Sequence, residues 1–544
     1  MEMTTDEILK EASLAEEEGD LQKANALFQS AILNQPTNSE INFRYGLFHL
    51  ACNDVERAIE CLQVAVASKP NEIAFRVTYI KALIEGHQNI EAAQEVTKAI
   101  KSGLKEHHAH ILRLIITSSS GQTSPSEEIT EALLRYLRSG KIQRAGELAV
   151  NIVKYFPRTS VGWEVLGAVH QHNGNLDKAL GAFKTVARLT PESAQAHNNL
   201  GFIFKKKGDL HKAEEYYNKA VELEPNYAEA IYNLGNTLQE NGKYDQARSS
   251  FKKVLALDES FAQARFNLAM SYFESGEYKA ALHHFEIVNN SESMEYAARC
   301  ALMIGDLKEL KRRLASLVNH EIPNSNIGSL ITRAEVRYGL QIVNPFCAKP
   351  LEFVRKTNLH TKYEFIREFF DPIKEFLDGK SYSDKAQRLL YNGSQTAGNI
   401  FSDADAGIKN IEECIRSEIN DYRSKFDESS EGLISRWPKN YEIYGWLIRM
   451  RDGGFLKPHI HERGWLSGSI YIRVPSNLKS DEGNLILRLD DKNCIDSKGT
   501  TIERKINVAS ADLCLFPSSL FHYTTPFSSR EERIVLAFDL IPKH

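Results

Sequence analysis

The chain has 544 residues, of which 42% are hydrophobic and 26% charged, a composition typical of folded globular proteins. Its 67 Lys and Arg against 72 Asp and Glu give a net charge of −5, which argues against binding to nucleic acid or to an anionic membrane. The sequence contains no run near the ~18 consecutive apolar residues of a membrane span. At ~150 residues per domain, the length predicts roughly three or four domains.

The first residues and the cysteines both bear on location. The acidic start, MEMTTDEILKEASLAEEEGD, has no apolar stretch of the kind found in secretory signals. The 7 Cys are scattered singly, with no CxxC pair. Reduced thiols in a reducing compartment are therefore expected, and we predict a cytoplasmic protein.

A repeat with a period of 34 residues fills the N-terminal half. Small residues at recurring positions let two helices approach closely, and recurring glycines between the helices suit a positive φ. The columns are Ala145, Ala179, Ala213, Ala247 and Ala281; Gly140, Gly174, Gly208, Gly242 and Gly276; Gly167, Gly201, Gly235 and Ala269; and Phe183, Tyr217, Phe251 and Phe285. The pattern resembles the tetratricopeptide repeat (TPR) family, whose signature positions hold Trp163, Leu166, Gly167, Ala179, Phe183 and Pro191. The resemblance implies an all-α solenoid.

The period also extends upstream, through Ala24, Ala58 and Ala92, and a Ser/Gly/Pro-rich stretch near 118–126 interrupts it. We therefore predict a first TPR array over 1–117, a linker over 118–130 and a second array over 131–320 with a degenerate last repeat.

An asparagine recurs on the first helix of three successive repeats, at Asn199, Asn233 and Asn267. An amide in the concave groove of a solenoid can bond an extended peptide backbone. The arrangement resembles the asparagine ladder in the TPR groove of O-linked N-acetylglucosamine transferases. These residues are predicted to line a groove for a protein or peptide partner, the alternative being a tolerated polar position on a helix. The oligomeric state is not predicted.

After residue 320 the pattern changes. A proline-punctuated connecting segment is predicted over 321–361, and an amphipathic helix over 406–425. Beyond Pro438 come short β-rich runs over 443–450, 466–474, 484–489, 501–508, 512–516 and 533–541. The acidic pairs Asp481-Glu482 and Asp490-Asp491 are expected in solvated turns. These runs predict a mainly β domain over 362–544 with a helical lead-in, its core a jelly roll or double-stranded β-helix of cupin-like type at about 440–544.

Three histidines in this region have the pattern of a metal site. His459 and His461 are two residues apart in an extended context, so their imidazoles point to the same side. His522 follows 61 residues after His461, and strands so separated in a double-stranded β-helix can lie side by side. Three neutral imidazoles leave open positions on an iron-type metal.

The segments Gly453–His461, Gly464–Tyr471, Leu515–His522 and Pro526–Asp539 resemble the 2-oxoglutarate/Fe(II) oxygenases that are often fused to TPR arrays. The resemblance implies Fe(II), 2-oxoglutarate and O₂, with His459 as the first ligand, His522 as the distal ligand and Arg533 as the anchor of the far carboxylate of 2-oxoglutarate. Arg530 is the competing anchor, and Arg533 is favoured because it opens the last strand. Tyr471 either contacts 2-oxoglutarate or packs in the core.

One position departs from the family pattern: His461 stands where the family has Asp or Glu. The neighbouring Glu462 points to the opposite side of an extended chain, so we predict His461 rather than Glu462 as the third ligand. Three functions remain open: a 2-oxoglutarate-dependent hydroxylase to which the TPR array recruits a protein, a TPR scaffold with a catalytically silent barrel, and a three-His cupin-type dioxygenase that does not use 2-oxoglutarate.

Overall fold

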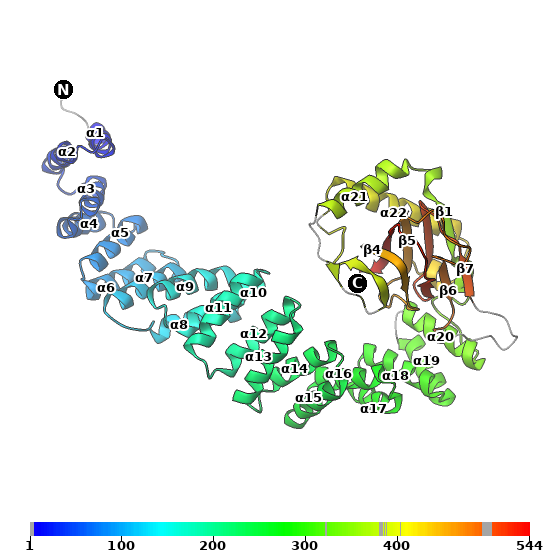
Figure 1. Ribbon diagram of the computed structural model, residues 1–544. Coiled ribbons are helices and arrows are strands. Elements are labelled where there is room, and N and C mark those ends of the chain that lie inside the picture. The colour runs from blue at the N-terminus through cyan, green and yellow to red at the C-terminus, as the bar shows by residue number, and fades with distance from the viewer. Residues whose placement is uncertain are drawn as a thin grey trace. The chain divides into compact units, whose positions relative to one another are not determined.

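The computed structural model describes residues 5–320, 324–379, 384–385, 387, 389–402, 404–491 and 503–543. The chain divides into two units, residues 1–260 and 261–544. Figure 1 shows helices throughout the first unit, and further helices followed by β-strands in the second. In the described part of the chain, no helix has both the length and the apolar character to cross a bilayer.

The first unit is a TPR solenoid of antiparallel helix pairs. Its helices are α1 Thr5–Glu17, α2 Leu21–Asn34, α3 Ser39–Ala51, α4 Val55–Ser68, α5 Ile73–Glu85, α6 Asn89–Lys101, α7 Glu106–Ser119, α8 Glu127–Arg138, α9 Ile142–Tyr155, α10 Ser160–His172, α11 Leu176–Leu189, α12 Ala194–Lys206, α13 Leu210–Leu223, α14 Ala228–Glu240 and α15 Tyr244–Leu257.

The repeated small and aromatic residues meet inside each helix pair. A Cβ added to Gly167 on α10 would lie 2.5 Å from the ring of Phe183 on α11, and a Cβ at Gly235 would lie 2.7 Å from Phe251. The aromatic ring therefore occupies the space that the missing side chain leaves. The turn glycines have positive φ, as predicted, with Gly174 at 74°.

The second unit begins with five helices: α16 Ala262–Glu274, α17 Tyr278–Val288, α18 Ser291–Ile304, α19 Leu307–His320 and α20 Ser325–Tyr338. Helix α20 lies inside the segment predicted to connect the two parts of the chain. Its start is stabilised by Asn324, whose side chain accepts a hydrogen bond from the Ile327 amide, and its end by Gly339 in the left-handed region. Helical structure therefore continues past residue 320.

The rest of this unit is mainly β. Its strands are β1 Arg355–Asn358, β2 Asp384–Lys385, β3 Leu390–Thr396, β4 Tyr441–Leu456, β5 Leu466–Arg473, β6 Leu485–Arg488, β7 Glu503–Ile506, β8 Asp512–Pro517, β9 Phe521–Thr524 and β10 Arg533–Pro542. Its longer helices are α21 Asp371–Asp378 and α22 Ala406–Lys425, beside the short helices η1 Pro350–Phe353, η2 Leu359–Thr361, η3 Ile366–Phe370 and α23 Gly432–Ser435.

The strands form two antiparallel sheets, one in the order β1-β8-β5-β10-β4-β3-β2 and the other in the order β7-β6-β9. The predicted jelly roll is thereby confirmed, and each predicted run contains a strand. Residues 501 and 502 of one predicted run lie outside the described part. Strands β1, β2, β3 and β9 were not predicted, and β9 is the one that carries His522.

Strand β10 separates two cores because its side chains alternate between the faces of the larger sheet. Leu536 and Phe538 pack with Ile411 and Ile415 of α22, on the face that the helices cover. Val535 and Ala537 lie on the other face, between the two sheets. Every second residue along β10, starting from 533 and ending at 539, therefore lies on the same face as Val535 and Ala537, between the two sheets.

The expectation of a solvated turn at Asp490-Asp491 was wrong. The Asp490 side chain is fully buried and accepts hydrogen bonds from Arg337 Nε and Nη2 at 2.6 and 2.5 Å, while Arg333 Nε lies at 3.3 Å. Arg337 also pairs with Asp491. The carboxylates are desolvated because helix α20 covers the end of β6. These ion pairs attach the helical part of the unit to its smaller sheet.

Candidate metal centre

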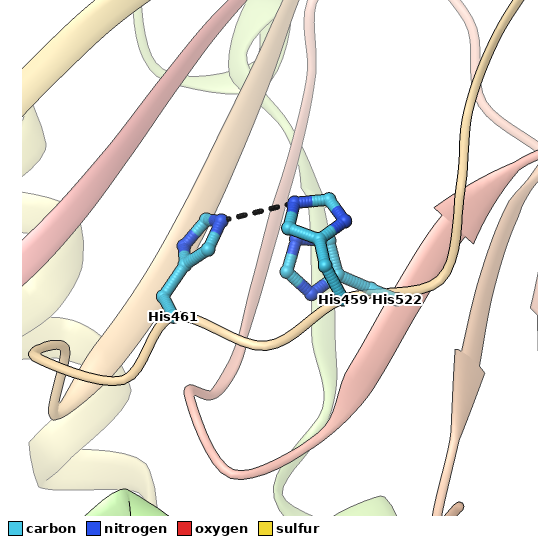
Figure 2. Close-up of side chains that lie close together, drawn as sticks. All are labelled: His459, His461 and His522. Carbon is cyan, nitrogen blue, oxygen red and sulfur yellow. Dashed lines mark hydrogen bonds between the residues drawn. The ribbon is translucent and has the colours of Figure 1, made fainter. Parts of the chain in front are cut away.

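The three predicted histidines come together at one end of the smaller sheet. His459 and His461 lie in the segment between β4 and β5, and His522 lies on β9. The backbones of His459 and His522 exchange two hydrogen bonds, with N–H···O distances of 3.1 and 2.9 Å. Figure 2 shows the rings of His459 and His522 beside each other, with His461 facing them. The extended chain around 459–461 thus places both imidazoles on the side where β9 lies.

The separations between ring nitrogens are close to those of a metal site. His461 Nε2 lies 3.3 Å from His459 Nε2, and one potential ligand atom from each residue lies within 4.8 Å of the others. Imidazole nitrogens ~2.1 Å from a common ion lie roughly 3.0 to 3.4 Å apart in octahedral or tetrahedral geometry. The pair His459 and His461 already has this spacing, and a ring nitrogen of His522 lies within 4.8 Å of a ring nitrogen of each.

Hydrogen bonds at the far side of each ring fix which nitrogen is free. His459 Nδ1 donates to the Lys457 carbonyl at 2.8 Å and His522 Nδ1 faces the Leu520 carbonyl at 3.4 Å. His461 Nδ1 lies 2.6 Å from Asp539 Oδ1. Carbonyl and carboxylate oxygens only accept, so each Nδ1 carries a hydrogen and Nε2 is the nitrogen left for a metal. His461 Nε2 and His459 Nε2 face each other at 3.3 Å, within hydrogen-bond distance (Figure 2). A metal ion bound to both nitrogens can replace the proton between them, which suits these residues to a metal site.

Burial keeps two of the rings neutral. Desolvation, followed by the electrostatic effect of the neighbouring His461, lowers the pKa of His459 to about 4. Desolvation, with the neighbouring His459 and His461, holds the pKa of His522 well below its usual value. Neutral imidazole is the form that binds a metal, so at neutral pH no proton has to leave these two rings.

A buried carboxylate behind His461 was not assigned a role from the sequence. Asp539 is 7% exposed, and its Oδ1 accepts from Ser467 Oγ at 2.7 Å as well as from His461. Ser467 in turn lies 2.7 Å from Ser518 Oγ. Carboxylates that orient metal-binding histidines in this way strengthen the ligand. The sequence signal that could have indicated Asp539 was its spacing from Arg533: the two are six residues apart on one strand and so lie on the same face.

Arg533 and Tyr471 share a cavity with the three histidines. The Arg533 side chain is fully buried, its Nη1 donates to the Gly483 carbonyl at 2.6 Å, and its Nε and Nη2 have no hydrogen-bond partner in the described part of the chain. Those two groups form one edge of the guanidinium, the edge that binds a carboxylate bidentately. The Tyr471 ring centroid lies 5.2 Å from Arg533 Cζ.

This unpaired edge fits an anionic cosubstrate, and the donor set fits Fe(II). The cavity itself is small, about 40 Å³. That volume holds an ion and a few waters, so a five-carbon dicarboxylate requires the side chains around it to move outward.

Arg530 and Glu462, the competing candidates for the cosubstrate anchor and the metal ligand, lie outside this cavity. Arg530 is exposed in the loop before β10. Glu462 is exposed too, and its carboxylate accepts a hydrogen bond from Arg299 Nη1 of α18 at 2.6 Å. Neither residue lines the cavity of the three histidines.

The asparagines of the repeat array occupy equivalent positions on successive first helices. Asn199 on α12, Asn233 on α14 and Asn267 on α16 are each partly exposed. Asn233 Nδ2 donates to the side chain of the buried Asn198 at 3.0 Å. The role of these residues in partner binding stays a prediction.

Comparisons with known families agree with both resemblances. Residues 444–539 match a family model described as "Putative 2OG-Fe(II) oxygenase". Tetratricopeptide repeat models match residues 159–226, 192–260 and 227–286, and the middle TPR-like domain of cilia and flagella-associated protein 70 matches residues 9–190. The predicted combination of N-terminal TPR repeats with a C-terminal domain of this oxygenase type is confirmed.

No curated protein matches the chain. Similar solved structures include PilW, a type IV pilus biogenesis factor, at 22% identity over 35% of this chain and 91% of PilW, with a TM-score of 0.32. They also include a tetratricopeptide repeat protein from Parabacteroides merdae at 20% identity over 46% of this chain and 97% of that protein, with a TM-score of 0.33.

Proposed function

We propose that the C-terminal domain is a 2-oxoglutarate- and Fe(II)-dependent oxygenase that hydroxylates a substrate with O₂. The observation that carries this proposal is one cavity that contains three imidazoles and the unpaired edge of a buried guanidinium. A metal site alone would not need Arg533, and burying an arginine with two unsatisfied donors is costly unless a ligand pairs with them.

The residues have distinct jobs in this proposal. His459, His461 and His522 hold the metal through Nε2, and Arg533 binds the far carboxylate of 2-oxoglutarate through Nε and Nη2. Tyr471 forms the wall beside that carboxylate. Bound Fe(II) would supply the redox chemistry that couples decarboxylation of 2-oxoglutarate to succinate with oxidation of the substrate.

A second function is favoured by a specific observation. No carboxylate is among the three metal-binding side chains, and the cavity is only about 40 Å³. Both features also suit a three-His cupin-type dioxygenase that does not use 2-oxoglutarate. A TPR scaffold with a silent barrel is the remaining alternative.

One experiment separates the three functions. Purified chain is loaded anaerobically with Fe(II), and after O₂ is added succinate is measured with and without 2-oxoglutarate. Succinate formation that depends on both iron and Arg533 supports the oxygenase. Stoichiometric metal binding without succinate, and with Arg533→Ala harmless, supports the cupin type. Absence of metal binding supports the scaffold and contradicts the proposal.

The repeats give the proposed enzyme its partner. TPR arrays generally bind proteins, and we propose that this array recruits a protein or peptide in the cytoplasm, with Asn199, Asn233 and Asn267 on the binding face. Pull-down with wild type and with the triple Ala variant of these asparagines tests that role. Equal capture by both proteins contradicts it.

A further inference from the structure

A second, larger cavity lies in the same unit as the metal centre. It is a cleft of about 540 Å³ between the first turns of α18 and α20 and the β domain. Ser291, Asn324 and Ser325 line the helical side. On the other side lie Arg463, Gly464 and Trp465, the residues that follow the turn after His461. Neither the metal nor the cosubstrate site uses this cleft.

The cleft has an excess of positive charge. Arg436, Lys439 and Arg463 line it, are exposed, and make no side-chain hydrogen bond or ion pair with other described residues. Lys543 also lines it and lies 3.0 Å from Glu442. Because a concave surface with like charges focuses their field, an anionic ligand is attracted into it.

Two carboxylates at the cleft are already engaged. Glu462 is the one carboxylate among the lining residues, and it is bonded to Arg299. Glu295, on α18, accepts hydrogen bonds from Asn324 at 2.9 Å and Asn326 at 3.0 Å. These carboxylates therefore do not neutralise the three unpaired cations.

The cleft also has apolar lining residues. Pro438, Trp465, Ile541 and Pro542 line it between the charged residues. A small inorganic anion needs only the cations, whereas a chain with acidic side chains and an apolar backbone surface uses both. The volume also falls in the range of about 300 to 1,000 Å³ that is typical of ligand pockets. We propose that this cleft binds an acidic peptide segment of a partner protein.

The cleft and the metal centre share one turn of the chain, at residues 461–464. The Gly464 amide donates to the His461 carbonyl at 3.1 Å, which closes the turn between them. A Cβ at Gly464 would lie 2.5 Å from Ser518 Oγ and 3.2 Å from Asp539 Oδ1. A peptide in the cleft thus packs against the turn that positions His461. That the peptide is the substrate rests on the proposed function, whereas its binding does not.

The test measures binding to the full chain without metal. A fluorescein-labelled peptide of about twelve residues in which Glu and Ser alternate, about 40 Å long when extended, is titrated and followed by anisotropy. We expect binding that weakens as salt is raised. Arg436→Glu/Lys439→Glu/Arg463→Glu should weaken it about tenfold or more. The matched control Lys279→Glu/Lys409→Glu/Lys425→Glu makes the same charge change at exposed positions of the same unit, and should leave it nearly unchanged.

Several outcomes overturn the proposal. The first is an equal loss of peptide affinity in both triple variants. The second is that the matching Lys/Ser peptide binds as tightly as the acidic one. The third is that tripolyphosphate or a single-stranded oligonucleotide binds the cleft in preference to the peptide. Circular dichroism of each variant shows that its fold is intact. Because no metal or turnover is involved, failure here leaves the proposed oxygenase activity standing, and failure of succinate formation leaves this result standing.

Discussion

Asp539 Oδ1 accepts the hydrogen of His461 Nδ1 at 2.6 Å. His461 lies in the segment between β4 and β5, and Asp539 lies on β10, 78 positions further along the chain. His461 stands where the resembling oxygenases have a carboxylate ligand. In this structure the buried Asp539 carboxylate lies behind the His461 ring, on the side away from the proposed metal. The negative charge is therefore kept close to the centre without occupying a coordination position.

Loss of that charge should weaken metal binding. We expect Asp539→Asn to lower the affinity for Mn(II), used as an oxygen-stable probe, by about 10- to 100-fold, because the histidine becomes a poorer ligand. Isothermal titration calorimetry measures this directly. Ser467→Ala is the control, since it removes the second hydrogen bond to Asp539 but keeps its charge. An unchanged affinity in a folded Asp539→Asn protein contradicts a role for Asp539 at the metal.

The Arg533 edge predicts a selective effect on 2-oxoglutarate. Arg533→Lys keeps the positive charge but removes the bidentate pair of donors, so the KM for 2-oxoglutarate should rise about tenfold or more. Metal affinity should change little, because Arg533 is not a ligand. Steady-state succinate formation measures the first quantity and calorimetry the second. Arg530→Lys, in the exposed loop nearby, should behave like wild type; equal KM values for both variants would rule out Arg533 as the anchor.

The buried ion pairs of Asp490 predict a stability difference between two acidic positions. Asp490→Ala leaves Arg333 and Arg337 poorly paired in a desolvated site, which costs about 3–5 kcal/mol in the free energy of unfolding. Asp481→Ala, at an exposed position, should cost less than about 0.5 kcal/mol. Urea denaturation of both variants measures the difference. Similar midpoints for the two proteins would show that the ion pairs contribute little.

The same site predicts the direction of a pH effect. Burial raises the pKa of Asp490, but the hydrogen bonds from Arg337 and the nearby guanidinium charges lower it more, so it lies well below its usual value. The unfolded chain therefore binds the proton more readily, and this contribution to stability is present above the usual carboxyl pKa and is lost as the pH falls below it. In Asp490→Ala, the fall in stability on acidification should be smaller.

Two glycines within helices of the array, one in a repeat column and one outside it, predict opposite effects of the same substitution. Gly235→Ala puts a methyl group 2.7 Å from the fully buried Phe251 ring. We expect overpacking of about 1–3 kcal/mol to exceed the helix-propensity gain of about 1 kcal/mol. At Gly181 on α11 nothing lies within 4 Å of the added Cβ, so Gly181→Ala should stabilise. Thermal unfolding followed by circular dichroism compares them. Stabilisation by both substitutions would contradict the packing seen inside the helix pairs.

The repeats and the three histidines could be predicted because their signals are local or periodic. The 34-residue columns repeat one packing solution many times, and alternation in an extended segment puts His459 and His461 on one side. The helix over 406–425 was predicted with its bounds, since its apolar residues follow helical spacing.

The role of Asp539 and the burial of Asp490 could not be predicted from local or periodic signals. The role of Asp539 depends on strand register, which sets it opposite Ser467 across β10 and β5. The burial of Asp490 depends on α20, whose arginines lie about 150 residues earlier in the chain. Strand β9 was missed because it has only four residues, although its aromatic and β-branched residues, FHYT, favour a strand. Pairing between distant segments decides these features.

The most direct test of the account is an anaerobic Fe(II) titration of wild type and of His459→Ala, His461→Ala and His522→Ala, with and without 2-oxoglutarate. We predict one iron per wild-type chain, at least a 10-fold loss of affinity in each variant, and tighter 2-oxoglutarate binding when iron is present. His283→Ala, on helix α17, is the control and should bind iron like wild type. If wild type binds no iron, or if the three variants bind it as tightly as the control, the proposed metal centre is contradicted.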